Sequence, residues 1–292
     1  MANDIIFLYI KRSWKMNIFR IEKTDKYYLI YIFKLKLSFS ARKNYLKERL
    51  CFIEKIKGLF LKDKKYYETI IPLGRNCEFA SNAYRYHGIF ESSLFLWTAA
   101  GDPARVIEFI KNPDDLFSQG CTFCDKTAGW SCNKFGFGFH SKNKPKYFKQ
   151  NDILDTNKVA LDKKEIESRV GYLKEKFKKQ IKCKDKKLFV ITLDVNSNPE
   201  YIHILNNLYS VLNEVSTNFD LLIVIEQNQY HQDIKDFEQK HENVYIRLLE
   251  KFSDVQTANK PLDALGWTKI FNEFKPLHKP DKRKRKKLKF EK

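Results

Sequence analysis

A cysteine follows a short apolar segment in the sequence Ile-Ile-Pro-Leu-Gly-Arg-Asn-Cys, residues 70–77. The apolar run predicts a strand over 69–73, and a helix is expected from Cys77 to His87 with Asn76 as its N-cap. At a helix N-terminus, backbone N–H groups and the helix dipole favour the thiolate and lower the pKa of a thiol. Cys77 is therefore a candidate nucleophile. The alternative is that it is a small buried side chain.

His140 directly follows the segment 134–139, in which Phe135, Phe137 and Phe139 alternate with glycines. This pattern predicts a strand whose glycine face is closely approached by another part of the chain. An imidazole beside a thiolate can accept its proton and later return it to a leaving group, which is the minimum for nucleophilic catalysis. We expect His140 to play this part for Cys77, with N–H groups at the helix start forming an oxyanion hole.

Two carboxylates follow the all-apolar segments 188–193 and 221–225, which predict strands buried on both faces. Ligands of open parallel sheets bind beyond the carboxyl ends of the strands, and there the sequence has Asp194 and Glu226. The rule also selects Gly74 to Cys77, which follow the first strand. A second hypothesis is therefore a non-covalent transferase in which the two carboxylates bind or deprotonate the acceptor.

A competing constellation uses His140 as a metal ligand, together with Cys121, Cys124 and Cys132. Cys-x2-Cys is a zinc half-site, but seven residues separate Cys124 from Cys132 and seven more separate Cys132 from His140. Structural zinc sites more often pair two closely spaced ligand pairs. The zinc and catalytic hypotheses exclude each other because both use His140. In the catalytic hypothesis no cofactor is expected.

The pattern along the body predicts a three-layer α/β fold with a mostly parallel sheet and helices on both faces. Apolar residues at helical spacing predict helices over 103–111, 198–215 and 267–274. A further long helix is predicted to begin at a cap-like pair, Asp162 and Glu165, and to continue to Ile181. Alternation at 244–248 predicts an edge strand.

The N-terminal part, residues 1–68, is predicted to be a basic appendage to a body spanning 69–278. Alternation over 17–39 predicts a β-hairpin, and apolar residues at helical spacing over 42–60 predict a basic amphipathic helix. That helix would pack on the body or on a second copy, or lie on a membrane surface. Residues 61–68 are expected to be a linker, and 279–292 a disordered basic tail.

The net charge of +19 is concentrated at the two ends of the chain. Residues 1–68 hold 17 basic and 7 acidic side chains, and 279–292 hold 9 and 2, whereas the body has 29 and 27. A nearly neutral body argues against a specific nucleic-acid surface. The basic ends predict electrostatic attachment to an anionic membrane surface or to a polyanion.

No apolar segment long enough to span a bilayer and no signal peptide is evident in the sequence. The six cysteines are therefore expected to be reduced thiols. Together with the basic ends, these features predict a cytoplasmic protein that can attach peripherally to the inner face of the membrane.

The segment Pro-Leu-Gly-Arg-Asn-Cys, with Phe95-Leu96-Trp97 about twenty residues later, resembles a family of papain-like cysteine peptidases. This domain of unknown function occurs with capsule and lipooligosaccharide gene clusters. Leu73-Gly74-x-x-Cys77 matches the family's first motif, and Trp-x-x-Ile-Phe at 267–271 is similar to a later one. Leu96 stands where the family usually has aspartate. The resemblance covers roughly residues 70–275.

The resemblance implies a cysteine nucleophile, a histidine base, and a glycan or acyl substrate in the synthesis of cell-surface polysaccharide or lipooligosaccharide. Gly74, Arg75, Asn76 and Trp97 would bind that substrate. Because Leu96 removes a carboxylate, either Asp194 or Glu226 orients the histidine, or this member is catalytically altered. A third hypothesis is a non-catalytic, membrane-associated scaffold in which Cys77 is only packed. Oligomeric state does not follow from the sequence.

Overall fold

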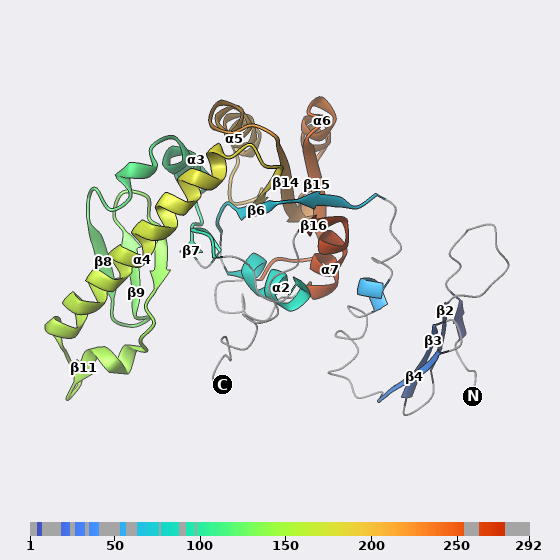
Figure 1. Cartoon of the computed structure of the whole chain (residues 1–292), viewed down its shortest axis with the longest axis horizontal. Helices are drawn as coiled ribbons and strands as arrows, with labels where there is room; N and C mark the ends of the chain where they lie inside the picture. The colour runs from blue at the N-terminus through green and yellow to red at the C-terminus, as the bar shows by residue number, and fades with distance from the viewer. Residues whose placement is uncertain are drawn as a thin grey trace. The chain divides into compact units, whose positions relative to one another are not determined.

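The computed structural model describes ten segments, and the chain forms two compact units, residues 1–60 and 61–292 (Figure 1). The described segments are residues 5–7, 19–23, 27–32, 35–40, 53–56, 63–75, 77–87, 92–96, 98–253 and 263–277. Asn76, Trp97 and the predicted tail 279–292 lie outside them.

The first unit contains an antiparallel sheet of four strands. They lie in the order β1 (Ile5–Phe7), β2 (Phe19–Lys23), β3 (Tyr27–Ile32) and β4 (Leu35–Ser40). The pairing of β2 with β3 confirms a hairpin within 17–39. The single second strand expected up to Phe39 is wrong, because β3 and β4 pair antiparallel with each other, and β1 adds a fourth strand beside β2. Of the predicted helix 42–60, only 53–56 is described, and these residues are helical.

The second unit is built on a parallel sheet whose strands lie side by side in chain order. They are β6 (Thr69–Pro72), β13 (Lys187–Thr192), β14 (Phe219–Glu226) and β15 (Val244–Leu249). Every residue of β13 is buried, as expected of a strand covered on both faces. The predicted edge strand at 244–248 is confirmed, because among the described strands β15 pairs only with β14.

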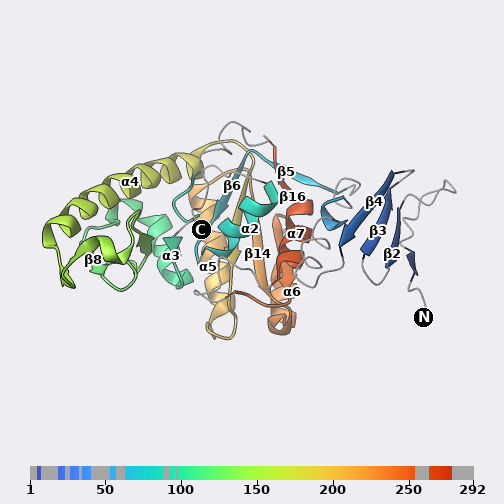
Figure 2. The same cartoon turned by 90° about the horizontal axis from the view of Figure 1, so that it is seen from below.

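Helices cover both faces of this sheet, which confirms the predicted three-layer α/β fold (Figures 1 and 2). The helices are α2 (Glu78–His87), α3 (Pro103–Lys111), α4 (Thr156–Lys182), α5 (Tyr201–Val215), α6 (Gln232–Lys240) and α7 (Ala264–Glu273). Phe189 and Ile191 point into the apolar core beneath α3 to α6, whereas Leu188 and Val190 point into the core beneath α2 and α7. This alternation follows from the two-residue period of a strand.

A second, antiparallel sheet is inserted between α2 and α4, and it carries His140. Its order is β7 (Thr98–Ala99), β10 (Gly138–His140), β9 (Gly129–Cys132) and β8 (Cys121–Cys124). Two small ladders complete the unit, one of β11 (Lys149–Gln150) with β12 (Ile153–Leu154) and one of β5 (Lys65–Tyr67) with β16 (Phe274–Pro276). Short 3-10 turns lie at η2 (Pro113–Asp115), η3 (Pro145–Phe148) and η4 (Gln227–Gln229).

The predicted linker at 61–68 is wrong, because β5 lies within it and belongs to the second unit. Tyr67 is fully buried, its ring stacks on Phe274, and its hydroxyl donates to Asp220 at 2.7 Å. Burial of this aromatic ring gives the segment a fixed place in the core. The sequence did not predict this burial, because the lysines near Tyr67 are typical of an exposed segment.

The predicted start of α4 is also wrong. The helix begins at Thr156, where Asp155 caps it by accepting from the N–H groups of Asn157 and Lys158 at 3.1 and 3.2 Å. Asp162 is not a cap but a buried side chain within the helix. Aspartate is a preferred N-cap residue, and both Asp155 and Asp162 are aspartates. The sequence pattern therefore did not show that the earlier one, Asp155, is the cap.

The predicted strand over 134–139 is shorter and later than expected, since only Gly138–His140 pairs. Residues 133–135 form a turn, and Gly136 has a positive φ of 68°. The expected close approach does occur at Gly138, where an added Cβ would lie 3.3 Å from the Ala99 Cβ.

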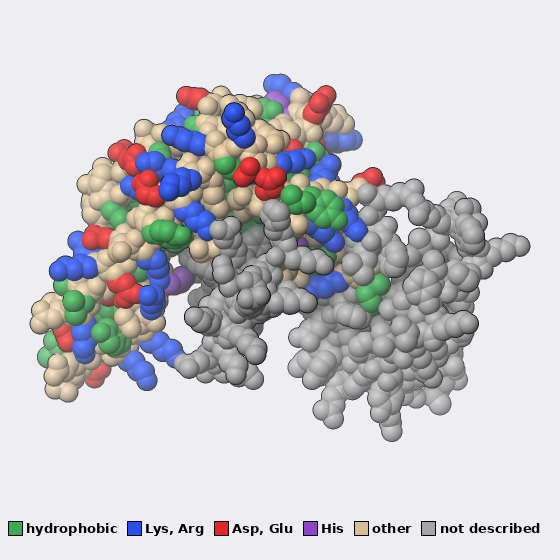
Figure 3. Space-filling model, viewed as in Figure 1, with side chains coloured by type: hydrophobic (Ala, Val, Ile, Leu, Met, Phe, Trp, Pro, Cys, Tyr) green, Lys and Arg blue, Asp and Glu red, His purple; other side chains and the backbone are tan. Residues whose placement is uncertain are grey.

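The face of the molecule seen in Figure 3 has Lys and Arg side chains interspersed with Asp and Glu over the described part of the second unit. Several of these charges form ion pairs along α4, such as Lys178 with Asp114. Among the described helices, none has the length and apolar character needed to cross a membrane.

Candidate functional site

The loop after β6 lies against the end of β7 at a glycine, where any larger residue would be strained and would clash. Gly74 has a φ of 102°, and a Cβ built on it would lie 2.8 Å from the Cβ of Ala100 and 2.9 Å from its carbonyl oxygen. This close approach lets Arg75 pair with Ala100 through two backbone hydrogen bonds of 2.7 and 3.2 Å. The loop thereby becomes continuous with the antiparallel sheet.

That pairing brings the two predicted catalytic residues together. Cys77 stands just before the first residue of α2, and β10 lies beside β7 with Phe139 opposite Thr98. As a result the Cys77 Sγ and the His140 Nε2 are 3.9 Å apart, although 63 residues separate them in the chain. Cys77 is half-buried and His140 is exposed. The structure thus brings together a thiol and an imidazole that solvent can reach.

Burial raises the pKa of the Cys77 thiol, which is opposite to the predicted shift. The helix-dipole argument for a lowered pKa therefore does not describe the free protein. Asn76, the predicted cap, lies outside the described residues. The thiol is protonated at neutral pH, so a reaction at Cys77 needs a base in contact with Sγ. His140 is the group so placed.

His140 is positioned by α4, which the sequence did not suggest. Arg169 donates to the His140 carbonyl oxygen at 2.5 Å. The buried carboxylate of Asp162 accepts from Ser141 Oγ at 2.7 Å and from Trp130 Nε1 at 2.7 Å, which fixes both β10 and β9 to the helix. These contacts leave the imidazole free to face Cys77, because they use the backbone of residue 140 and its neighbours.

Arg75, two residues before Cys77, is partly buried near three acidic side chains, Glu78, Asp194 and Glu226. Its guanidinium stacks 4.1 Å from the centre of the Phe252 ring and donates to the Ser253 carbonyl oxygen and to Glu78, each at 3.5 Å. Burial lowers the pKa of Arg75, and the negative charges of Glu78, Asp194 and Glu226 oppose that shift. Arg75 therefore joins the loop after β6 to the loop after β15, and it is available to a ligand only through its partly exposed edge.

Glu78 is a fully buried carboxylate that sequence reasoning missed. It accepts from the Ser253 backbone N–H at 3.0 Å and from Trp267 Nε1 at 3.1 Å, and thus binds the start of α2 to α7. Burial raises the pKa of Glu78, and the hydrogen bonds from Trp267 and Ser253 and the charge of Arg75 oppose this shift. Trp267 of the Trp-x-x-Ile-Phe segment at 267–271 thus supports the residue next to Cys77.

The two predicted strand-end carboxylates do lie at the carboxyl ends of β13 and β14, but neither is hydrogen-bonded to His140. Asp194 accepts from Ser197 Oγ at 2.7 Å and from Gln229 Nε2 at 3.0 Å. Burial opposes its ionisation, but these hydrogen bonds and the charge of Arg75 together lower the pKa of the Asp194 carboxyl. Glu226 accepts from the Phe252 N–H at 2.7 Å.

The expectation that one of these carboxylates orients the imidazole is therefore wrong. Within the described residues, no carboxylate is hydrogen-bonded to the His140 ring. The position where the resembling family has aspartate is occupied by Leu96, which is buried in the apolar core beneath α2 and α7. The site is a thiol–imidazole pair without a third member.

The alternative zinc site is also wrong. No group of three or more His, Cys, Asp or Glu side chains suited to a metal occurs in the described part of the chain, which includes all four proposed ligands. Cys121 and Cys124 lie three residues apart on strand β8 and therefore point to opposite faces of the sheet. Cys132 is buried opposite Cys121, and His140 pairs with Gly129 at the far end of β9.

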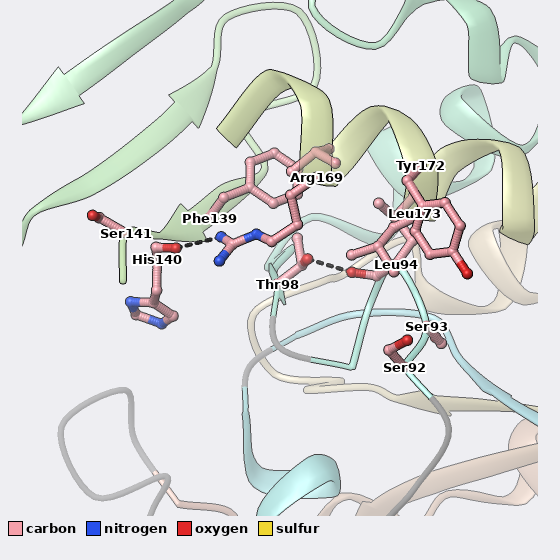
Figure 4. Close-up of a pocket in the computed structure, with 11 residues that line it drawn as sticks. Ser92, Ser93, Leu94, Thr98, Phe139, His140, Ser141, Arg169, Tyr172 and Leu173 are labelled. Atoms are coloured by element: carbon pink, nitrogen blue, oxygen red, sulfur yellow. Dashed lines mark hydrogen bonds between the residues drawn. The ribbon is translucent and has the colours of Figure 1, made fainter. Parts of the chain in front are cut away.

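A cavity of about 500 Å³ lies next to His140 and is lined by residues 92–94, 98, 139–141, 169, 170, 172 and 173 (Figure 4). We call it the Arg169 pocket. In Figure 4 the His140 and Arg169 side chains lie at one end, and Tyr172 and Leu173 lie at the other. Trp97, the predicted substrate-binding residue nearest in sequence, lies outside the described residues.

Comparison with known proteins adds nothing to these observations, because no family model, no curated protein and no solved structure matches the chain. The resemblance to papain-like cysteine peptidases stays a prediction based on residues 72–97. The geometry of the thiol and the imidazole stands independently of it.

Proposed function

We propose that the second unit is an enzyme that uses Cys77 as nucleophile and His140 as general base in acyl transfer or hydrolysis. The observation that carries the proposal is the 3.9 Å separation of Cys77 Sγ and His140 Nε2. Two independent parts of the chain converge to produce it, and Arg75, a non-glycine residue with a positive φ of 75°, stands where they meet. Strain of this kind is characteristic of functional sites.

The reaction begins with the thiol protonated. As Sγ attacks the carbonyl carbon of the substrate, its proton moves to His140 Nε2, and backbone N–H groups at the start of α2 stabilise the oxyanion. The imidazolium then returns the proton to the leaving group, which departs and leaves a thioester on Cys77. Water or an alcohol acceptor, deprotonated by His140, attacks the thioester and regenerates the thiol.

The substrate in this proposal is an ester or amide of a cell-surface glycan precursor, as the resemblance implies. The basic segments 1–68 and 279–292 would hold the cytoplasmic enzyme at the anionic inner face of the membrane, where such precursors are assembled. Both points rest on the sequence alone. Neither changes the chemistry assigned to Cys77 and His140.

The competing transferase, in which Asp194 and Glu226 act on the acceptor, has less support. Both side chains already accept hydrogen bonds from the protein, and those bonds hold the loops after β13 and β14. A carboxylate acting as base would have to exchange these donors for the substrate. The scaffold hypothesis leaves the contact between Cys77 and His140 without a use.

The experiment that tests the proposal is acylation by p-nitrophenyl acetate, followed by release of nitrophenol and by mass spectrometry of the cysteine peptides. We expect an early burst and an acetyl group on Cys77. In Cys77→Ala the burst should disappear while the thermal unfolding midpoint stays within a few degrees of the parent.

The matched control is Cys124→Ala, which removes an exposed thiol on β8 and should leave the burst intact. The proposal is refuted if acetyl is found on Cys124 rather than Cys77, or if the burst persists in Cys77→Ala. A slow, equal reaction of all exposed thiols would likewise contradict it, because no base would then be assisting Cys77.

A further inference from the structure

The Arg169 pocket contains a cation that no acidic side chain of the described residues neutralises. Arg169 is half-buried on α4, and its recorded hydrogen bond goes to the His140 carbonyl oxygen. Other cations on the same helix do have carboxylate partners, for example Lys174 with Asp114 and Lys163 with Glu167. An unneutralised guanidinium at the wall of a cavity is suited to a carboxylate, which it can bind through two parallel N–H groups.

The body of the pocket is apolar. Leu94, Phe139 and Val170 are almost fully buried and line it, and Leu173 closes the end away from His140 (Figure 4). The volume of about 500 Å³ lies within the range of cavities that enclose small organic ligands. Apolar walls of this kind favour a hydrocarbon group, which gains free energy by leaving water.

A second polar group in the pocket has no partner. Ser93 is only 4% exposed, lines the cavity, and its Oγ makes no hydrogen bond within the described part of the chain. Two other hydroxyls of the lining have protein partners, since Thr98 donates to the Leu94 carbonyl oxygen and Ser141 to Asp162, whereas those of Ser92 and Tyr172 belong to exposed residues. A buried hydroxyl without a partner costs free energy, and a ligand that bonds to it removes that cost.

We infer that the Arg169 pocket binds a hydroxylated acyl group, with its carboxyl end at Arg169 beside His140 and its hydroxyl at Ser93. The inference rests on the proposed function for the identity of the acyl donor. In that setting the pocket holds the acyl chain beside His140, which lines the pocket and also contacts Cys77. Arg169 then binds the free carboxylate that hydrolysis releases. The pocket predicts binding of the carboxylate itself, whether or not Cys77 reacts.

The test is isothermal titration calorimetry of the full chain with three probes of equal carbon number. Octanoate carries the anion and the chain, 1-octanol carries the chain alone, and 8-hydroxyoctanoate adds a hydroxyl at the opposite end from the carboxylate. We expect 8-hydroxyoctanoate to bind most tightly and 1-octanol at least tenfold more weakly than octanoate.

Two variants assign the contributions. Arg169→Gln should weaken both carboxylates about tenfold and leave 1-octanol unchanged, which also shows that the pocket is still formed. Ser93→Ala should remove the advantage of 8-hydroxyoctanoate over octanoate. The matched control is Lys174→Gln, which deletes a cation of the same helix outside the pocket and should change none of the three affinities.

The inference is overturned if octanoate and 1-octanol bind equally, or if Lys174→Gln weakens octanoate as much as Arg169→Gln does. It is also overturned if the hydroxyl advantage survives in Ser93→Ala. Cys77→Ala separates this result from the proposed function. Unchanged octanoate binding in Cys77→Ala, with no acylation in the parent, would retain the pocket and reject the chemistry.

Discussion

Two places on the same edge of the parallel sheet contrast in what their polar side chains are doing. At the end of β6, Cys77 meets His140 at 3.9 Å, a separation that leaves the thiol without a strong hydrogen bond. At the ends of β13 and β14, Asp194 and Glu226 accept short, well-formed hydrogen bonds, from Ser197 in the same loop and from Phe252 in the loop after β15. All three residues lie at strand ends, yet of these only Cys77 lacks a strong hydrogen bond.

The difference lies in what each loop packs against. The loop after β6 joins a second sheet through Ala100, and that sheet supplies an exposed imidazole. The loops after β13 and β14 pack on each other and on the loop after β15, and their carboxylates satisfy backbone and amide donors there. A position at a strand end is therefore insufficient to identify a reactive group. Its hydrogen-bond partners decide the outcome.

The largest expected effect comes from removing the polar group of one residue near each strand end, His140 beside Cys77 and Asp194 after β13. His140→Ala should slow acylation of Cys77 by about 10²- to 10⁴-fold, because the proton of a neutral thiol then has no acceptor. Asp194→Asn should change the rate less than threefold. The burst rate with p-nitrophenyl acetate measures both, and an equal loss in the two variants would contradict the assignment of the base.

Gly74→Ala should have the next largest effect, now on folding. The added Cβ would clash with Ala100 and force a positive φ on alanine, so we expect the free energy of unfolding to fall by about 2 to 4 kcal/mol. Urea denaturation measures this loss. Gly101→Ala is the matched control, since a Cβ there meets nothing within 4 Å. Equal stability of the two variants would show that the close approach is unimportant.

The smallest effect concerns the pH at which two thiols react with iodoacetamide. Burial raises the pKa of Cys77, whereas hydrogen bonds from the Thr127 side chain and backbone lower the pKa of Cys124. Only the thiolate is alkylated, so on raising the pH Cys124 should react first and Cys77 later. Mass spectrometry of the two peptides gives both profiles. The reverse order, abolished by His140→Ala, would instead indicate a preformed thiolate–imidazolium pair.

Elements whose ends depend on nearby residues were predicted well. The helix over 103–111 has the predicted bounds, because Asp102 caps it and Pro103 suits the first position. The central strands were identified from their unbroken apolar runs. The start of α4 was missed because Asp155 and Asp162 are equally plausible caps in sequence, and only packing shows that Asp162 is buried.

The residues that support the site were harder to predict. Asp162 was interpreted as a helix cap, and Glu78 and Arg169 were not singled out, because a surface helix has many charged residues. Their partners, among them Trp267 and Trp130, lie far away in the chain. Pairing over such distances leaves no periodic or short-range signal in one sequence.

The sequence by itself determined the three-layer class, the strand–loop–helix around Cys77, and the choice of Cys77 and His140 as candidates. These depend on apolar periodicity and on residue types, which are local properties. Only the tertiary structure decided that the imidazole meets the thiol, that the carboxylates do not join them, and that burial raises the pKa of Cys77. Each of these outcomes depends on which segments that are distant in the chain contact or hydrogen-bond each other. Those contacts form only when the two sheets and α4 pack together.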